Sequence, residues 1–227
     1  MLGDREGEFL FPTGITVGET GLIYVSDCHN NRIQVFDKNG GFMRQWGMYG
    51  AGDGQFNGPH GIVFNPDGEL IVADTMNNRL QKFEMDPYYK VSFMGVAGRS
   101  GNGCAEFRKP SGLACSKDGR LFVSDYMNHR VQVWDECYIG AWGKEGEREG
   151  EFRYPEGMAI DDNSIVYVGD TRNHRVQAFR SDGTFLHQFG TARLDDVFQE
   201  PAMSIYGLAF GNGVLYVCGE HHISVFA

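Results

Sequence analysis

One sequence segment recurs four times along this chain, and a fifth time in weakened form. The four clear copies occupy 9–47, 56–95, 107–143 and 152–190, and the fifth runs from about 198 to 227. The aspartate that ends the second apolar run of each clear copy recurs at intervals of 47, 51 and 45 residues. Repetition at this period predicts units arranged in an array, such as propeller blades, rather than an irregular domain.

Each copy contains short β-forming runs separated by turn sequences. In the first copy the runs are 14–17, 22–26, 32–36 and 41–46. Asn-Gly and Asp-Gly pairs between them, as at Asn39-Gly40 and Asp182-Gly183, are strong hairpin signals because these residues tolerate positive φ. The second run is apolar on both faces, which is typical of a strand buried on both sides. We therefore predict an all-β chain, a single-domain β-propeller over 1–227 with about five four-stranded blades, the last incomplete. A β-sandwich does not account for the period.

Composition limits the class of protein. The formal charge of −10 disfavours polyanionic partners unless basic residues gather on one face. The five cysteines form no CxxC pair, which is typical of reduced thiols in an intracellular protein, with a secreted origin as the alternative. Neither a signal peptide nor a long apolar run is evident. We therefore expect a cytoplasmic protein that makes no membrane contact.

The recurring motif resembles a known repeat. It reads Pro-x-Gly-Ile, in which Leu or Met replaces Ile in the third and fourth copies, then Val-x-Asp, then Asn-x-Arg-[Ile/Val/Leu]-Gln, and finally an aromatic residue followed by Gly. This pattern resembles the NHL repeat, found among others in tripartite-motif proteins of the ubiquitin-ligase type. The resemblance covers almost the whole chain and implies a β-propeller, for which six blades are usual. This chain departs from that count, either as a five-bladed ring with a thin last blade or as part of a larger ring.

An aspartate and an arginine recur with fixed spacing in the four clear copies. Each Asp ends the second strand and each Arg begins the third, so the pair brackets one hairpin, in which a carboxylate can accept turn N–H groups and pair with the guanidinium. Because they recur, whereas catalytic groups are unique in a chain, we interpret them as structural and predict no catalytic residue. They are Asp27, Arg32, Asp74, Arg79, Asp125, Arg130, Asp170 and Arg175. Asn30 or Asn31, Asn77 or Asn78, Asn128 and Asn173 are expected to supply the left-handed turn residue.

The residue between the repeated Pro and Gly varies and should line the mouth of the central channel. These residues are Thr13, His60, Ser111 and Glu156. A peptide-amidating lyase with related repeats binds its catalytic zinc through histidines in a comparable Pro-His context, but here only His60 matches. Three protein ligands are usual for a catalytic zinc. We expect no cofactor and no enzymatic activity in this domain, with His60 a weak metal candidate and a lyase or hydrolase at the channel as an alternative. The parent protein could still be a ubiquitin ligase.

One face should combine the linkers between blades with the loop between the second and third strands. The linkers 48–55, 96–106, 144–151 and 191–197 carry four basic and eight acidic residues. Phosphate binding depends on clustered Lys and Arg, so RNA binding is disfavoured, although it remains the alternative implied by the tripartite-motif relatives. Tyr, Met and Arg are typical of protein interfaces. We therefore predict a protein-interaction scaffold, with no small-molecule substrate evident, whose face includes Tyr49, Met76, Tyr126, Met127, Glu147, Glu149 and Arg172.

Overall fold

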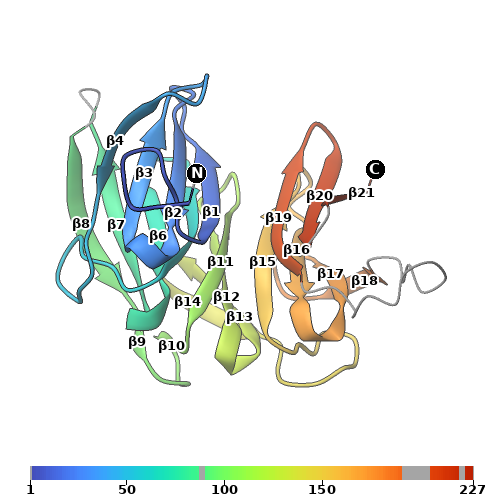
Figure 1. Ribbon diagram of the computed structural model, residues 1–227. Helices are drawn as coiled ribbons and strands as arrows, with labels where there is room; N and C mark the ends of the chain where they lie inside the picture. Colours follow the sequence, from blue (N-terminus) through green and yellow to red (C-terminus); the bar gives the residue numbers. More distant parts are fainter. Residues whose placement is uncertain (1, 87–89, 191–204, 220–222, 227) are drawn as a thin grey trace.

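The computed structural model describes residues 2–86, 90–190, 205–219 and 223–226, which form five antiparallel sheets with the strands of each paired in chain order (Figure 1). Blade one contains β1 (Pro12–Val17), β2 (Ile23–Asp27), β3 (Arg32–Phe36) and β4 (Phe42–Trp46). Blade two contains β5 (Pro59–Phe64), β6 (Leu70–Asp74), β7 (Arg79–Met85) and β8 (Val91–Ala97). Blade three contains β11 (Pro110–Cys115), β12 (Leu121–Asp125), β13 (Arg130–Asp135) and β14 (Cys137–Trp142).

Blade four contains β15 (Pro155–Ile160), β16 (Val166–Asp170), β17 (Arg175–Phe179) and β18 (Phe185–Gly190). Blade five contains β19 (Ile205–Gly211), β20 (Val214–Gly219) and β21 (Ile223–Phe226). Two short strands, β9 (Arg99–Ser100) and β10 (Glu106–Phe107), pair in parallel within the linker after blade two. The helices in the described ranges are 3-10 turns: η1 (Cys28–Asn30), η2 (Thr75–Asn77), η3 (Tyr126–Asn128) and η4 (Thr171–Asn173). None of these is long or apolar enough to span a membrane.

The sheets are the blades of a β-propeller, as the repeat predicts. The first strands β1, β5, β11, β15 and β19 pack against one another in this order and are therefore innermost. Blade five has three strands, so the prediction of an incomplete last blade is confirmed for the described residues. Its expected start at 198–204 lies outside them. Blade two ends at Ala97, beyond the expected 95, because β7 and β8 are each seven residues long.

The hydrophobic core is divided among the seams between neighbouring blades. Each of the first three seams contains a phenylalanine from the start of the later blade, and these residues, Phe56, Phe107 and Phe152, are fully buried. The glycine of each Pro-x-Gly motif allows the innermost strands to approach closely. A Cβ on Gly14, for example, would lie 2.2 Å from the His60 carbonyl oxygen. The repeat therefore specifies the contact between blades as well as the strands within them.

The two ends of the blade series leave apolar side chains uncovered in the described structure. Ile15 on β1 is 68% exposed, whereas the equivalent Ile62, Leu113 and Met158 are 5–8% exposed because a preceding blade covers them. On β21, Ile223 is 64% exposed, although Ile33 at the same register position is fully buried. β1 and β19 touch at only a few residues. The contact between blades one and five is thus much smaller than the other seams.

Candidate interaction face

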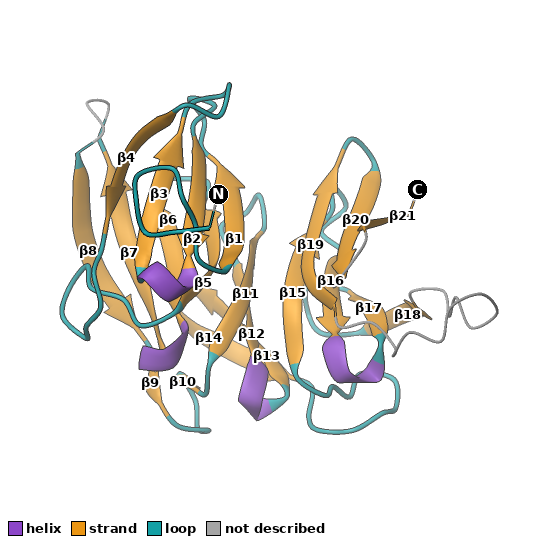
Figure 2. Ribbon diagram, in the orientation of Figure 1, coloured by secondary structure: helices purple, strands orange, loops and turns teal. Residues whose placement is uncertain are grey.

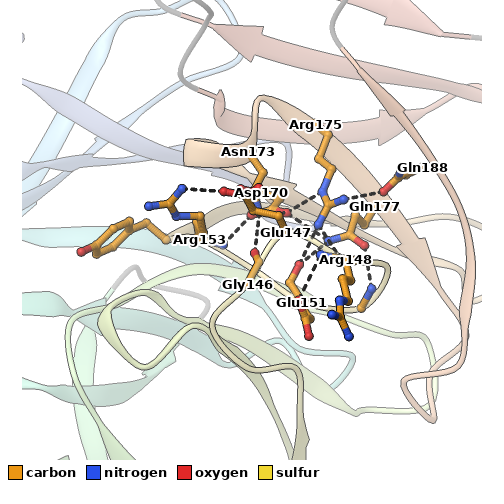
Figure 3. A network of polar contacts seen from close by, with 12 residues as sticks. Gly146, Glu147, Arg148, Glu151, Arg153, Asp170, Asn173, Arg175, Gln177 and Gln188 are labelled. Atoms are coloured by element: carbon orange, nitrogen blue, oxygen red, sulfur yellow. Dashed lines mark hydrogen bonds and ion pairs between the residues drawn. The ribbon is translucent and has the colours of Figure 1, made fainter.

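A buried aspartate organises the loop end of each of the first four blades (Figure 3 shows blade four). Asp170 is fully buried, and its Oδ2 accepts hydrogen bonds from Arg175 Nε at 2.7 Å, Asn173 Nδ2 at 2.8 Å and Gln177 Nε2 at 3.1 Å. Its Oδ1 accepts a fourth, from the Arg153 backbone N–H at 2.7 Å. The same four donor types converge on Asp27, Asp74 and Asp125.

The arginine of each network also binds the linker that precedes its blade. Arg175 Nη2 donates to the carbonyls of Arg148 at 2.7 Å and Glu151 at 2.9 Å, and Gln177 Nε2 donates to Glu151 as well. Arg32 makes equivalent bonds to residues 5 and 8, so the N-terminal segment is held like a linker. The network therefore holds the hairpin of each of these blades to the linker that precedes the blade. The glutamines Gln34, Gln81, Gln132 and Gln177 belong to it, and the Asn-x-Arg-x-Gln motif was the signal for them.

The four 3-10 turns and the linkers lie on one side of the molecule, which we call the turn face (Figure 2). Each turn ends in a left-handed residue with φ between 53 and 55°. These residues are Asn31, Asn78, His129 and His174, so the expectation for Asn128 and Asn173 was wrong. Asn128 and Asn173 instead donate to the buried aspartates, since Asp125 and Asp170 lie three residues earlier.

The turn face carries bulky residues that the sequence reasoning missed. The residue before the first-strand proline is left-handed in each of the first four blades: Phe11, Gly58, Lys109 and Tyr154, with φ of 53 to 60°. This conformation is unfavourable for a bulky residue, and doubly so before proline. It is stabilised across the seam in three cases, because the backbone N–H bonds to the left-handed turn residue of the preceding blade, as from Tyr154 to His129 Nδ1 at 3.1 Å.

These side chains form aromatic contacts on the turn face. The Phe11 and His29 rings have centroids 4.4 Å apart, and Tyr154 lies 4.5 Å from His129 and 5.0 Å from Tyr126. A sequence signal existed, because the residue that precedes the first-strand proline, two positions after the repeated Phe, varies among the copies.

The residues predicted for an interaction face lie on the turn face, but they differ in exposure. Tyr49 and Met76 are 71% and 46% exposed, whereas Tyr126 and Met127 are partly buried. Glu147, Glu149 and Arg172 are exposed, and Glu147 pairs with Arg153 at 2.9 Å. Arg108, Lys109 and Arg153 follow the linkers and lie outside the count of linker charges; Arg99, Arg108 and Lys109 form a local basic group that is too small to predict RNA binding. The turn face is therefore of mixed charge rather than uniformly acidic.

The predicted channel-mouth residues occupy the first strands, at a register shift that falls at each Pro-x-Gly motif. Thr13 Oγ1 donates to the Pro59 carbonyl at 3.1 Å, and Ser111 Oγ lies 3.3 Å from His60 Nδ1. Burial, with the charges of His29 and Lys109, lowers the pKa of His60 to about 4. Burial raises the pKa of Glu156 to about 7. Within the described ranges no three His, Cys, Asp or Glu side chains are placed to hold a metal ion; His221 and His222 lie outside them.

Comparison with known proteins identifies the repeat. The fold defines the class, a β-propeller of repeated antiparallel blades. The family model for the NHL repeat matches residues 9–36, 56–83, 107–134 and 152–179, so the chain is an NHL-repeat propeller.

The curated relatives match over short segments. Fifty residues, 22% of the chain, are 48% identical to RING finger protein nhl-1 of Caenorhabditis elegans and cover 5% of that protein. Forty-eight residues, 21% of the chain, are 46% identical to Protein brain tumor of Drosophila melanogaster and also cover 5% of it. The matched segments thus represent a small part of each relative.

Solved structures share the fold at low sequence identity. A gluconolactonase from Xanthomonas campestris superposes with a TM-score of 0.70 at 15% identity, covering 97% of this chain and 74% of the other. A virginiamycin B lyase from Staphylococcus aureus gives 0.63 at 16% identity, covering 99% and 70%. A nidogen–laminin complex gives 0.66 at 14% identity, covering 92% and 72%. These similarities concern the fold alone.

Proposed function

We propose that this propeller is a cytoplasmic protein-interaction domain that binds a protein partner through its turn face. The observation that carries the proposal is the left-handed backbone at Phe11, Lys109 and Tyr154. Blade two has Gly58 at this position, so the fold accepts the residue that adopts this conformation without strain. A glycine at these positions would relieve the backbone strain. The presence of larger residues there instead supports a function for their side chains.

The chemistry of the turn face supports a protein partner. Tyr154, Tyr126 and His129 form one aromatic cluster and Phe11 with His29 another. Aromatic rings with a polar end contribute large contact area at interfaces. The exposed Met76 adds a side chain that adapts its shape to a partner. The two clusters offer anchor points, and Met76 offers a flexible contact on the same face.

The distribution of charge on the turn face favours a protein partner over RNA. Arg153 pairs with Glu147, Arg99 with Glu106 and Lys144 with Glu151. Phosphate binding depends on unneutralised Lys and Arg that release counterions. Arg108, Lys109 and Arg172 make no ion pair among the described residues, and together with the tyrosines they are the feature that favours the RNA alternative. We assign no catalytic role to the channel mouth.

The proposal is tested by replacing the strained residues with glycine, as blade two already has. Phe11→Gly with Tyr154→Gly should abolish enrichment of the partner when the domain is purified from cells. The free energy of unfolding should change by about 1 kcal/mol or less, because relief of left-handed strain, worth about 1–2 kcal/mol per residue, offsets the lost ring contacts and the entropy of glycine. Ser181→Gly, in a hairpin turn at the opposite end of blade four, is the matched control.

Unchanged enrichment by the glycine variant would contradict the proposal. Ribonuclease treatment before purification separates the two classes of partner. A protein partner remains after treatment, whereas loss of the bound material would favour RNA.

A further inference from the structure

A cavity lies in the seam between blades two and three, where the sequence departs from that of the other blades. Its volume is about 610 Å³, and its apolar floor is formed by Leu80, Leu121 and Trp134. It extends to the hairpin turns at 65–67, 117–119 and 135–136, which lie at the end of the strands opposite the turn face. Cavities of this size hold small organic molecules in other proteins.

Two positions that line the cavity carry smaller side chains than their counterparts in other blades. The last residue of the fourth strand is Trp46 in blade one and Trp142 in blade three, but Ala97 in blade two, each opposite the residue after the repeated arginine. On the second strand, Ile71 replaces the Tyr24, Phe122 and Tyr167 of the other blades. Cys115 of blade three, at the position equivalent to Phe64, packs against the core of the same seam but is not among the residues that line the cavity.

At one position this seam has a larger side chain than the other blades, and that side chain gives the cavity an aromatic wall. Trp134 replaces the phenylalanine found at this position in the other blades, such as Phe83, and it stacks on Phe107 with centroids 5.5 Å apart. It is 7% exposed. Its Nε1, like those of the other two tryptophans, has no hydrogen-bond partner in the described part of the chain. The indole of Trp134 therefore borders the space that is left because Ala97 has no aromatic ring.

The rim of the cavity is acidic. Asp67, Glu69, Asp118, Asp135 and Glu136 line it, against Lys82 and Lys117. Lys82 is paired with Glu69 at 2.8 Å and Lys117 with Asp162 at 2.7 Å. Asp67, Asp135 and Glu136 make no ion pair within the described ranges. The free charge at the opening is negative.

We propose that this cavity, here called the seam pocket, binds a small aromatic amine. The planar ring occupies the space that a tryptophan at position 97 would fill and packs beside Trp134. The ammonium group lies at the rim near Asp135 and Glu136. The seam pocket is separate from the turn face, so it constitutes a second, small-molecule site.

The test uses tryptamine as the probe, titrated into the ¹⁵N-labelled 227-residue chain, with the three tryptophan indole signals followed by NMR. Trp134→Phe assigns its signal. Tryptamine should shift the Trp134 signal saturably and leave those of Trp46 and Trp142 in place. Indole-3-acetate, which has the same ring and the opposite charge, should bind on the order of tenfold more weakly. Spermidine, a cation without a ring, should not shift the Trp134 signal.

Variants localise the effect. Ala97→Trp and Ala97→Phe should each abolish the tryptamine shift by filling the pocket, with dispersed spectra showing that they fold. Met94→Trp, an exposed position on the same strand, is the matched control and should bind normally. Asp135→Asn with Glu136→Gln should remove the preference for tryptamine over indole-3-acetate. Absence of a saturable Trp134 shift, an equal shift by spermidine, or binding that persists in folded Ala97 variants would overturn the proposal.

Discussion

Replacing Asp125 by alanine should destabilise the propeller strongly, because its carboxylate is fully buried and accepts four hydrogen bonds. Removing one partner of a buried ion pair costs about 3–5 kcal/mol. Arg130 keeps its bonds to three linker carbonyls, and its side chain is 16% exposed, so the remaining cation is not fully desolvated. The Arg108 N–H, in contrast, loses its acceptor, which costs about 1–3 kcal/mol. We therefore expect a loss of about 3–4 kcal/mol.

The measurement is equilibrium unfolding in urea, with the denaturant slope compared among variants. Asp162→Ala is the matched control, since it removes a carboxylate from the exposed pair with Lys117 and should change the unfolding free energy by about 0.5 kcal/mol or less. Asp125→Asn keeps one acceptor oxygen and should fall between the two. A loss below about 1 kcal/mol in Asp125→Ala, or loss of partner binding in a variant of unchanged stability, would refute the structural role.

Further predictions concern the small contact between blades one and five, the channel mouth and the metal content of the protein. Ile62→Ala should lower the unfolding free energy by about 2–5 kcal/mol, whereas Ile15→Ala, at the equivalent but exposed position, should change it by about 0.5 kcal/mol or less in the same urea assay. Because the pKa of Glu156 is raised to about 7 in the folded protein, its contribution to stability is full below the normal carboxyl pKa and is lost as the pH rises toward 7. Glu156→Gln should therefore flatten the decrease in melting temperature between pH 5 and pH 8, and an unchanged decrease would argue against a buried carboxyl. Metal analysis of the purified chain should find no stoichiometric zinc; one equivalent that is lost in His60→Ala would instead favour the enzyme alternative.

The repeated features could be predicted from the sequence, because residues that recur at a fixed spacing occupy equivalent positions in every blade. The recurring Asp and Arg placed the end of each second strand and the start of each third, at Asp27 and Arg32 for example. The end of blade two was misplaced because its last hairpin is longer and its final aromatic is missing at Ala97. The seam pocket is formed by residues from two blades, such as Ala97 and Trp134, so it could be recognised only once the packing of these blades was known.

The site residues were harder to predict than the strands. The left-handed backbone at Lys109 and Tyr154 is stabilised by hydrogen bonds to the preceding blade, as from the Tyr154 N–H to His129 Nδ1. Counting charges in linkers alone missed the basic residues beside them, such as Arg153, which pairs with Glu147. Side-chain burial at Tyr126 also required the three-dimensional contact with Tyr154.

Site-specific photo-cross-linking tests most directly whether the turn face binds a protein. A benzophenone amino acid is placed at Tyr49 or Met76 on the turn face, and at Asn39 or Asp182 in hairpin turns at the opposite end as controls. We predict that irradiation in cells yields a discrete cross-linked protein from Tyr49 and Met76, resistant to ribonuclease and absent from the controls. Cross-links from Asn39 and Asp182 but not from the turn face, or cross-links to RNA alone, would contradict the account.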